Sequence, residues 1–204
     1  MSTSERGGRR TVVIGLGNPL MGDDGLGLAA LARLPEEWEL PPEVELVDGG
    51  TWGMNLLPVI EDAECVLLVD AIDVGATSGT EVQIPRERLP RYLATKISPH
   101  QVDLCDVLAL AELRGTLPER TTAIGLQPAR VVLSNELSDV VRVRLDDLVA
   151  GVVRQLESWG HVCTPKGAIA PCVSTGLTRG PPPQGPRPDG RGYDADGRGC
   201  ACMK

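Results

Sequence analysis

Two adjacent carboxylates stand inside a glycine-rich segment, a combination that points to cation chemistry. The segment GLGNPLMGDDGLG, Gly15 to Gly27, follows a short apolar run, Thr11 to Ile14. Phosphate-binding loops at strand ends offer backbone amides or a lysine, whereas Asp23 and Asp24 would repel an anion brought there. No lysine occurs before Lys96. The segment therefore favours a cation over a phosphate.

Two other residues further along the chain could join these carboxylates. Asp70 follows the apolar run Cys65–Val69, and His100 stands in the first turn of a helix predicted to follow Ser98. Asp24, Asp70 and His100 would form a mixed oxygen and nitrogen set that suits a borderline divalent ion such as zinc or nickel. Three protein ligands would leave one position open for water or for a group brought by a substrate.

Each of these residues also has a structural interpretation. Asp23 could be the N-cap of the first helix, and Asp24 could complement the dipole of that helix. Asp70 could begin an Asx turn before Ile72 and Asp73. His100 could be a partly exposed residue of a first helical turn.

Several neighbouring polar and glycine residues allow two interpretations as well. Asn18 could stabilise the glycine turn or face a substrate carbonyl group, and Gly49 and Gly50 could form a turn or allow a peptide backbone to come close. Gln101 fits a capping box with the serine three residues before it. His161 falls in the C-terminal segment, where we assign it no function.

The elements that must position these residues alternate between strands and helices. Predicted strands cover Thr11–Leu16, Val44–Asp48, Cys65–Val69, Thr80–Ile84 and Thr121–Gly125; predicted helices cover Leu26–Leu34, Gly53–Glu61, Ser98–Arg114 and Leu137–Trp159. This order predicts a three-layer α/β fold, a mostly parallel twisted sheet with helices on both faces. Ligands of such sheets bind beyond the carboxyl ends of the strands, where Asp24, Asp70 and His100 would meet.

Composition excludes several classes of function. The formal net charge of −8 argues against nucleic acid as a partner, and aromatic residues make up only 2% of the chain, without phenylalanine. No apolar run approaches the ~18 residues of a membrane helix. The polar N-terminus lacks the apolar stretch of a secretory signal, so we expect a cytoplasmic protein without membrane association.

The composition also changes along the chain. We expect a polar N-terminal extension at 1–10, one α/β domain at 11–159 and a disordered tail at 160–204, because the last 45 residues hold 7 Pro and 9 Gly. Cys65 and Cys105 lie in apolar runs and are predicted to be buried. The other four cysteines fall in the last fifth of the chain without the spacing of a zinc site.

Taken together, the motifs GLGNPLMGDDGLG, VELVDGGTWGMNLL, VLLVDAIDVG, SPHQVDLCDVLALAEL and AIGLQP resemble those of the hydrogenase maturation endopeptidases. The resemblance covers residues 11 to about 157 and departs from the family at the N-terminal extension and the tail. It implies an endopeptidase that removes the C-terminal extension of a [NiFe]-hydrogenase large-subunit precursor after nickel insertion. Carried over by position, it makes Asp24, Asp70 and His100 the metal-binding and catalytic residues.

The resemblance also implies the partners. Nickel would be carried by the precursor, and no organic cofactor is expected. The precursor would be the protein partner, and we expect the chain to be a monomer that binds neither nucleic acid nor membrane.

Three rival functions remain for comparison. A non-catalytic nickel-recognition or chaperone-like maturation factor would use the same residues. Peptidyl-tRNA hydrolases open with a similar GLGNP segment, but they require an early histidine and a basic surface, whereas the first histidine here is His100. A nucleotide-binding domain is disfavoured by Asp23 and Asp24.

Overall fold

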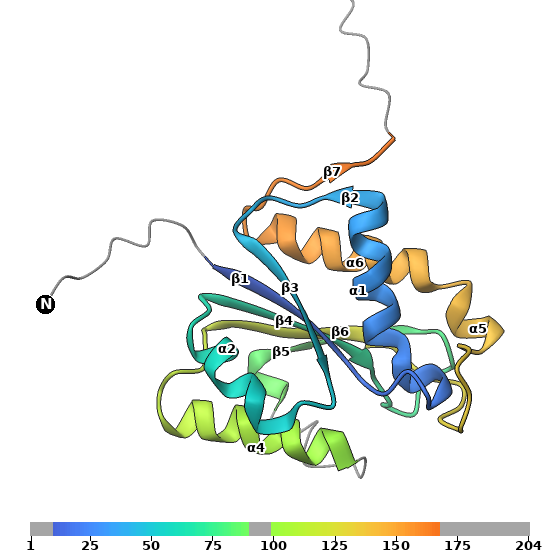
Figure 1. Cartoon of the computed structure of the whole chain (residues 1–204), viewed down its shortest axis with the longest axis horizontal. Coiled ribbons are helices and arrows are strands. Elements are labelled where there is room, and N and C mark those ends of the chain that lie inside the picture. The colour runs from blue at the N-terminus through green and yellow to red at the C-terminus, as the bar shows by residue number, and fades with distance from the viewer. Residues whose placement is uncertain (1–9, 90–98, 168–204) are drawn as a thin grey trace, which may run out of the picture. The chain divides into compact units, whose positions relative to one another are not determined.

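The computed structural model in Figure 1 describes residues 10–89 and 99–167, with the side chains of 99–103 left out. The described residues belong to one compact unit of the chain, Met1–Ala168, and the second unit, Ile169–Lys204, lies outside them. The predictions for residues 1–9 and for the tail from 168 onward therefore remain predictions.

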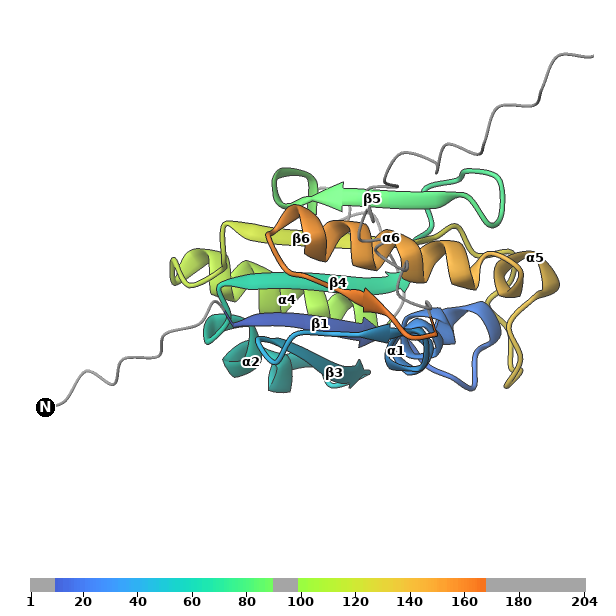
Figure 2. The same cartoon turned by 90° about the horizontal axis from the view of Figure 1, so that it is seen from above.

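A five-stranded sheet forms the centre of this unit. Its strands are β1 (Thr11–Leu16), β3 (Val44–Gly50), β4 (Cys65–Ala71), β5 (Glu81–Pro85) and β6 (Arg120–Leu126), in the order β3-β1-β4-β6-β5. The first four strands in that order are parallel, and β5 runs antiparallel to β6 at one edge. Figure 2 shows this order from above. The predicted mostly parallel α/β sheet is confirmed.

Helices cover both faces of the sheet. The helices are α1 (Leu26–Glu37), α2 (Leu57–Glu61), α4 (Pro99–Leu113), α5 (Asp139–Arg142) and α6 (Leu145–Ser158), with short 3-10 turns η1 (Gly22–Gly25), η2 (Gly53–Leu56) and η3 (Arg86–Arg88). In Figure 1, α1 and α6 lie on one side of the sheet, and α2 and α4 lie on the other. The three-layer arrangement follows from this placement.

The two core clusters reflect the alternation of side chains along each strand. In β1, Val13 packs with α1 and α6 on one face, whereas Val12 and Ile14 pack with α2 and α4 on the other. Both faces of the central strands are apolar because both are covered by helices. The continuous apolar runs in the sequence were therefore correctly interpreted as buried strands.

The predicted closing helix, Leu137–Trp159, is wrong as a single element. The structure has α5 and α6 with a turn at Val143 and Arg144 between them. Ser138 caps α5 and is hydrogen-bonded to Asp23, so a tertiary contact fixes where α5 starts. Val140 in α5 is 47% exposed, whereas its neighbour Val141 is fully buried.

The packed chain continues past Trp159, where the change of composition had suggested a boundary. Strand β7 (Thr164–Pro165) pairs with β2 (Trp38–Glu39), and Cys163 between α6 and β7 is buried. The ring nitrogen Nε2 of His161 is hydrogen-bonded to the hydroxyl of Thr11 at 2.7 Å. His161 thus has a structural contact with the first strand.

No helix within residues 10–89 and 99–167 has the length and apolar character needed to cross a bilayer.

Candidate functional site

The segment between β1 and α1 is packed backbone against backbone. A Cβ atom built on Gly17 would lie 1.8 Å from the carbonyl oxygen of Asp24, and one built on Gly27 would lie 2.1 Å from the carbonyl oxygen of Val69. Gly17 also has a φ of 109°, which side-chain-bearing residues rarely adopt. Close packing therefore accounts for these two glycines without a bound phosphate.

Asp24 lies in η1, beyond the carboxyl end of β1. Its side chain is buried, with 4% exposure, and its Oδ2 accepts a hydrogen bond from the backbone N–H of Asn18 at 2.9 Å. The turn η1 packs against β4. Asp24 therefore stands on an element that contacts the strand of Asp70.

Asp70 is the last residue but one of β4 and is 6% exposed. Its Oδ1 accepts a hydrogen bond from the N–H of Ala71 at 2.7 Å. In the parallel register of the two strands, Gly15 of β1 pairs with Val69. The glycine-rich segment thus begins beside Asp70.

The Asx turn that the sequence suggested at Asp70 occurs instead at Asp73. There, Oδ1 accepts a hydrogen bond from the N–H of Gly75, two residues on, at 3.0 Å. Asp73 is exposed in the loop after β4, where a turn must form, whereas Asp70 still belongs to the strand.

His100 is the second residue of α4, so its backbone has the predicted place in the first helical turn. The N-terminal end of α4 lies toward the edge where β1 and β4 end (Figures 1 and 2). The His100 side chain lies outside the described residues, as do the side chain of Gln101 and the proposed cap, Ser98.

A metal site made of described side chains alone is absent. Among the His, Cys, Asp and Glu side chains that the structure describes, no group of three could hold a metal ion. His100 is not among them, so the proposed set of Asp24, Asp70 and His100 stays a prediction.

Asp23 has a structural role, but it is not the predicted helix cap. No side chain caps η1 or α1. The fully buried carboxylate of Asp23 instead accepts hydrogen bonds from the N–H groups of Ala129 (2.8 Å), Arg130 (3.0 Å) and Ser138 (2.6 Å), and from the Ser138 hydroxyl (2.9 Å). Burial alone would raise the pKa of Asp23, but these hydrogen bonds outweigh it and lower the pKa below its ordinary value of 3.8.

Gln127 is a residue whose role the sequence reasoning missed. It is buried at the end of β6, and its Oε1 accepts hydrogen bonds from the N–H groups of Val74 (2.8 Å) and Ala76 (3.1 Å). Its Nε2 donates to Asp73 Oδ1 at 2.8 Å. Gln127 therefore shapes the loop that follows Asp70. One signal in the sequence could have identified it: Gln127 is a polar residue that directly follows the apolar strand β6, and β6 is the neighbour of β4 in the sheet.

Contacts in the structure give Asn18 and Gly49 structural roles. The Asn18 side chain accepts a hydrogen bond from the N–H of Leu20 at 2.9 Å, so it stabilises the glycine turn. Gly49 packs closely against Ile14, where a Cβ atom would lie 2.6 Å from the side chain. The close approach at Gly49 is therefore to strand β1, which pairs with β3.

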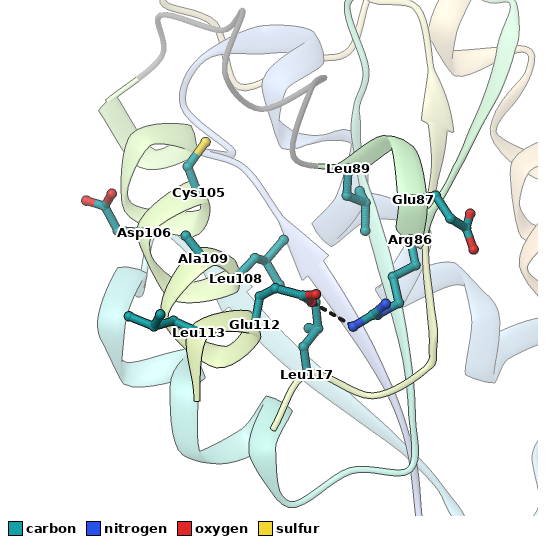
Figure 3. Close-up of a pocket in the computed structure, with 10 residues that line it drawn as sticks. All are labelled: Arg86, Glu87, Leu89, Cys105, Asp106, Leu108, Ala109, Glu112, Leu113 and Leu117. Carbon is teal, nitrogen blue, oxygen red and sulfur yellow. Dashed lines mark hydrogen bonds and ion pairs between the residues drawn. The ribbon is translucent and has the colours of Figure 1, made fainter. Parts of the chain in front are cut away.

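A cavity of about 620 Å³ lies elsewhere, between α4 and η3. Figure 3 shows Arg86 on one side of it, ion-paired with Glu112 of α4 at 2.7 Å, and Leu108 and Leu117 in its apolar wall. Cys105 also lines it and is only partly buried, so the predicted burial of this cysteine is partial, whereas Cys65 is buried as predicted. Among the described residues that line this cavity, neither Asp24 nor Asp70 is found.

Comparison with known proteins agrees with the fold and with the sequence motifs. The family model for hydrogenase maturation protease matches residues 29–155. The chain is 41% identical over 161 residues to the hydrogenase expression/formation protein HupD of Rhodobacter capsulatus, covering 78% of this chain and 76% of that protein. The hydrogenase 2 maturation protease of Escherichia coli K12 is 32% identical over 161 residues, covering 78% of this chain and 98% of its own.

The chain belongs to the hydrogenase maturation protease family. The solved structure of the hydrogenase maturating endopeptidase HybD from E. coli agrees, with a TM-score of 0.74 at 31% identity over 77% of this chain and 98% of that one. As a member of this family, the protein is a peptidase. The family match includes the positions of Asp70 and His100 and begins after Asp24.

Proposed function

We propose that this peptidase removes the C-terminal extension of a [NiFe]-hydrogenase large-subunit precursor after nickel insertion, and that Asp24, Asp70 and His100 engage the nickel that the precursor carries. Membership of the hydrogenase maturation protease family supports the processing activity. One structural observation carries the site: two buried carboxylates, on η1 and β4, occupy elements that contact each other at the carboxyl edge of the sheet.

The chemistry of the donor set fits this assignment. Carboxylate oxygens and an imidazole nitrogen bind borderline divalent ions such as nickel. Asp24 and Asp70 are 4% and 6% exposed, so an ion that they bind would be largely shielded from water, and its attraction to the carboxylates is stronger in such surroundings. The enzyme would supply ligands, and the precursor would supply the metal.

In this proposal the three side chains hold the nickel so that a nearby peptide bond of the precursor lies close to a water molecule. The water oxygen adds to the carbonyl carbon, the C–N bond breaks, and the released amine takes up the proton. The residues of the protease orient the substrate through its metal, and cleavage is restricted to precursors that already contain nickel.

The rival function, a nickel-recognition factor without peptidase activity, lacks a specific observation in its favour. The family to which the chain belongs consists of maturation proteases. A change in precursor mass after incubation with the purified protein would separate the two functions directly.

Processing of nickel-loaded precursor by Asp24→Asn, Asp70→Asn and His100→Ala variants tests the site. We expect the wild type to release the extension, as measured by mass spectrometry of the precursor, and each variant to lose at least about a hundredfold in rate, because a missing ligand misplaces the nickel. Precursor without nickel should not be cleaved by the wild type.

Asp146→Asn is the matched control, because Asp146 lies in α6 with its side chain 68% exposed. It should process the precursor at the wild-type rate. Wild-type rates in all three site variants, with folded protein confirmed by circular dichroism, would remove these residues from the mechanism.

A further inference from the structure

Four large apolar side chains are exposed next to the candidate site. Leu20 is 59% exposed, and Val131, Val132 and Leu133 are 50%, 47% and 84% exposed. We call these four residues the apolar rim. Leu20 stands four residues before Asp24, in the segment that carries that carboxylate.

Backbone contacts bring the two parts of the apolar rim together. The N–H of Ser134 donates to the carbonyl of Leu20 at 2.9 Å, and the N–H of Gly22 donates to the carbonyl of Ser134 at 2.7 Å. Met21 and Ser134 form an isolated parallel bridge. Leu20 and Leu133 therefore lie in two neighbouring segments whose backbones are hydrogen-bonded to each other.

Asp23 fixes the loop that carries the other three rim residues. Its carboxylate binds the N–H groups of Ala129 and Arg130 before the rim and both the N–H and hydroxyl groups of Ser138 after it. The N–H of Asp23 also donates to the carbonyl of Arg130 at 3.2 Å. The exposed side chains thus project from a loop that is tied down at both ends.

The apolar rim lies within two uncharged runs of sequence, and the exposed charged residues Arg130 and Glu136 stand on either side of the second run. The runs Leu16–Gly22 and Val131–Asn135 contain no charged residue, although 24% of the chain is charged. Depletion of charge and exposure of large apolar side chains are features of the central part of a protein interface. A surface held in place in advance also loses little conformational entropy on binding.

We propose that the apolar rim is the docking surface for the large-subunit precursor, which places an uncharged, apolar part of its own surface on these residues while its metal-bearing part reaches Asp24. The partner is inferred from continuity of the rim with the segment that carries Asp24, and in this respect the inference rests on the proposed function. Asp23 acts as a positioning residue that holds the docking loop beside η1.

The test compares the double variant Leu20→Asp/Leu133→Asp with Leu113→Asp in the full-length protein. Leu113 is the matched control because it is 85% exposed at the end of α4, away from the apolar rim. The dissociation constant is measured by surface plasmon resonance with each [NiFe]-hydrogenase large-subunit precursor of the source organism, purified with its extension and its nickel. KM and kcat for processing are measured with the same material.

The rim variant should bind the precursor at least roughly tenfold more weakly and show an increase in KM with little change in kcat, because it retains Asp24, Asp70 and His100. Leu113→Asp should bind like the wild type. The single variants Leu20→Asp and Leu133→Asp repeat the measurement if thermal unfolding shows that the double variant is destabilised.

Affinity within twofold of wild type in the folded rim variants would overturn the docking proposal, as would an equal loss of affinity in Leu113→Asp. A loss of self-association in place of precursor binding would overturn it too, and would identify the apolar rim as a contact between copies of this chain. The binding measurement does not require cleavage. Failure of the wild type to process the precursor would therefore count against the proposed function, and the measured affinities would still test the docking surface.

Discussion

At the scale of single residues, Asp23 and Asp24 have the same side chain but different partners. The four donors around Asp23 come from residues 129–138, whereas Asp24 accepts a hydrogen bond from Asn18 in its own segment. Successive residues of a 3-10 turn point about 120° apart, so neighbours in η1 reach different surroundings. Sequence alone offered a cap for Asp23 because the partner loop lies more than 100 positions away.

The first stability prediction concerns the carboxylate of Asp23. Asp23→Asn should lower the free energy of unfolding at pH 7 by about 2–3 kcal/mol, because an amide nitrogen replaces one acceptor among buried donors. Chemical denaturation monitored by circular dichroism measures this change. Asp62→Asn, at a side chain that is 67% exposed and 3.8 Å from Arg10, is the control and should change little.

The same variant carries a pH prediction. The pKa of Asp23 is lower in the folded protein than its ordinary value of 3.8, so its contribution to stability is present above pH 3.8 and is lost as the pH falls through the folded-state pKa. The difference in unfolding free energy between wild type and Asp23→Asn should therefore be full at pH 7 and shrink below about pH 3.8. A difference that stays constant down to pH 2 would contradict the role assigned to this carboxylate.

At the scale of elements, the first helix depends on how closely its backbone approaches the sheet. Gly27 in α1 lies against the backbone of β1 and β4, with the carbonyl oxygens of Leu16 and Val69 at 2.5 and 2.1 Å from the position of a Cβ atom. Backbone cannot move aside as a side chain can. The position of α1, and with it that of Asp24 in η1, requires a residue without a side chain.

Gly27→Ala should therefore destabilise the protein by about 2–4 kcal/mol, although alanine is the better helix former. Gly151→Ala in α6 is the matched control. A Cβ atom there would meet mainly side-chain atoms, the nearest at 3.0 Å from Ile124, and we expect a change within about 1 kcal/mol. Similar thermal unfolding temperatures for both variants would show that a Cβ atom at position 27 costs no more stability than one at position 151, and would contradict the requirement for glycine between α1 and the sheet.

At the scale of the whole molecule, the packed domain extends beyond the change of composition at Trp159. Cys163 is buried, His161 contacts Thr11, and β7 pairs with β2. Composition averages over many residues, so it could not detect the few contacts that residues 161–165 make at the start of a Pro- and Gly-rich segment.

Two truncations test this boundary. A chain ending at Gly167 should unfold at the same temperature as the full-length protein, whereas a chain ending at Trp159 should lose about 2 kcal/mol of stability, since it lacks the β2–β7 pair and the buried Cys163. Differential scanning calorimetry distinguishes these outcomes. Equal unfolding temperatures for all three chains would show that residues 160–167 contribute nothing to the fold.

Much of the fold was predictable because its signals are local. Continuous apolar runs identified β1 and β4, which are covered on both faces, and helical spacing identified α4. The start of α5 was not predictable, because a hydrogen bond between Asp23 and Ser138, 115 positions apart in sequence, fixes it. Gln127 escaped notice for the same reason, since its partners in the loop after β4 lie more than 50 positions away in sequence.

The sequence by itself determined the α/β class, the order of the elements, and a family resemblance that the comparisons confirmed, because apolar periodicity and motif spacing are written along the chain. Only the tertiary structure decided which neighbouring carboxylate is structural, where the Asx turn forms, and that Leu20 and Val131–Leu133 come together. Those outcomes depend on hydrogen bonds between segments far apart in sequence, and such partners are chosen only when the sheet brings the segments together.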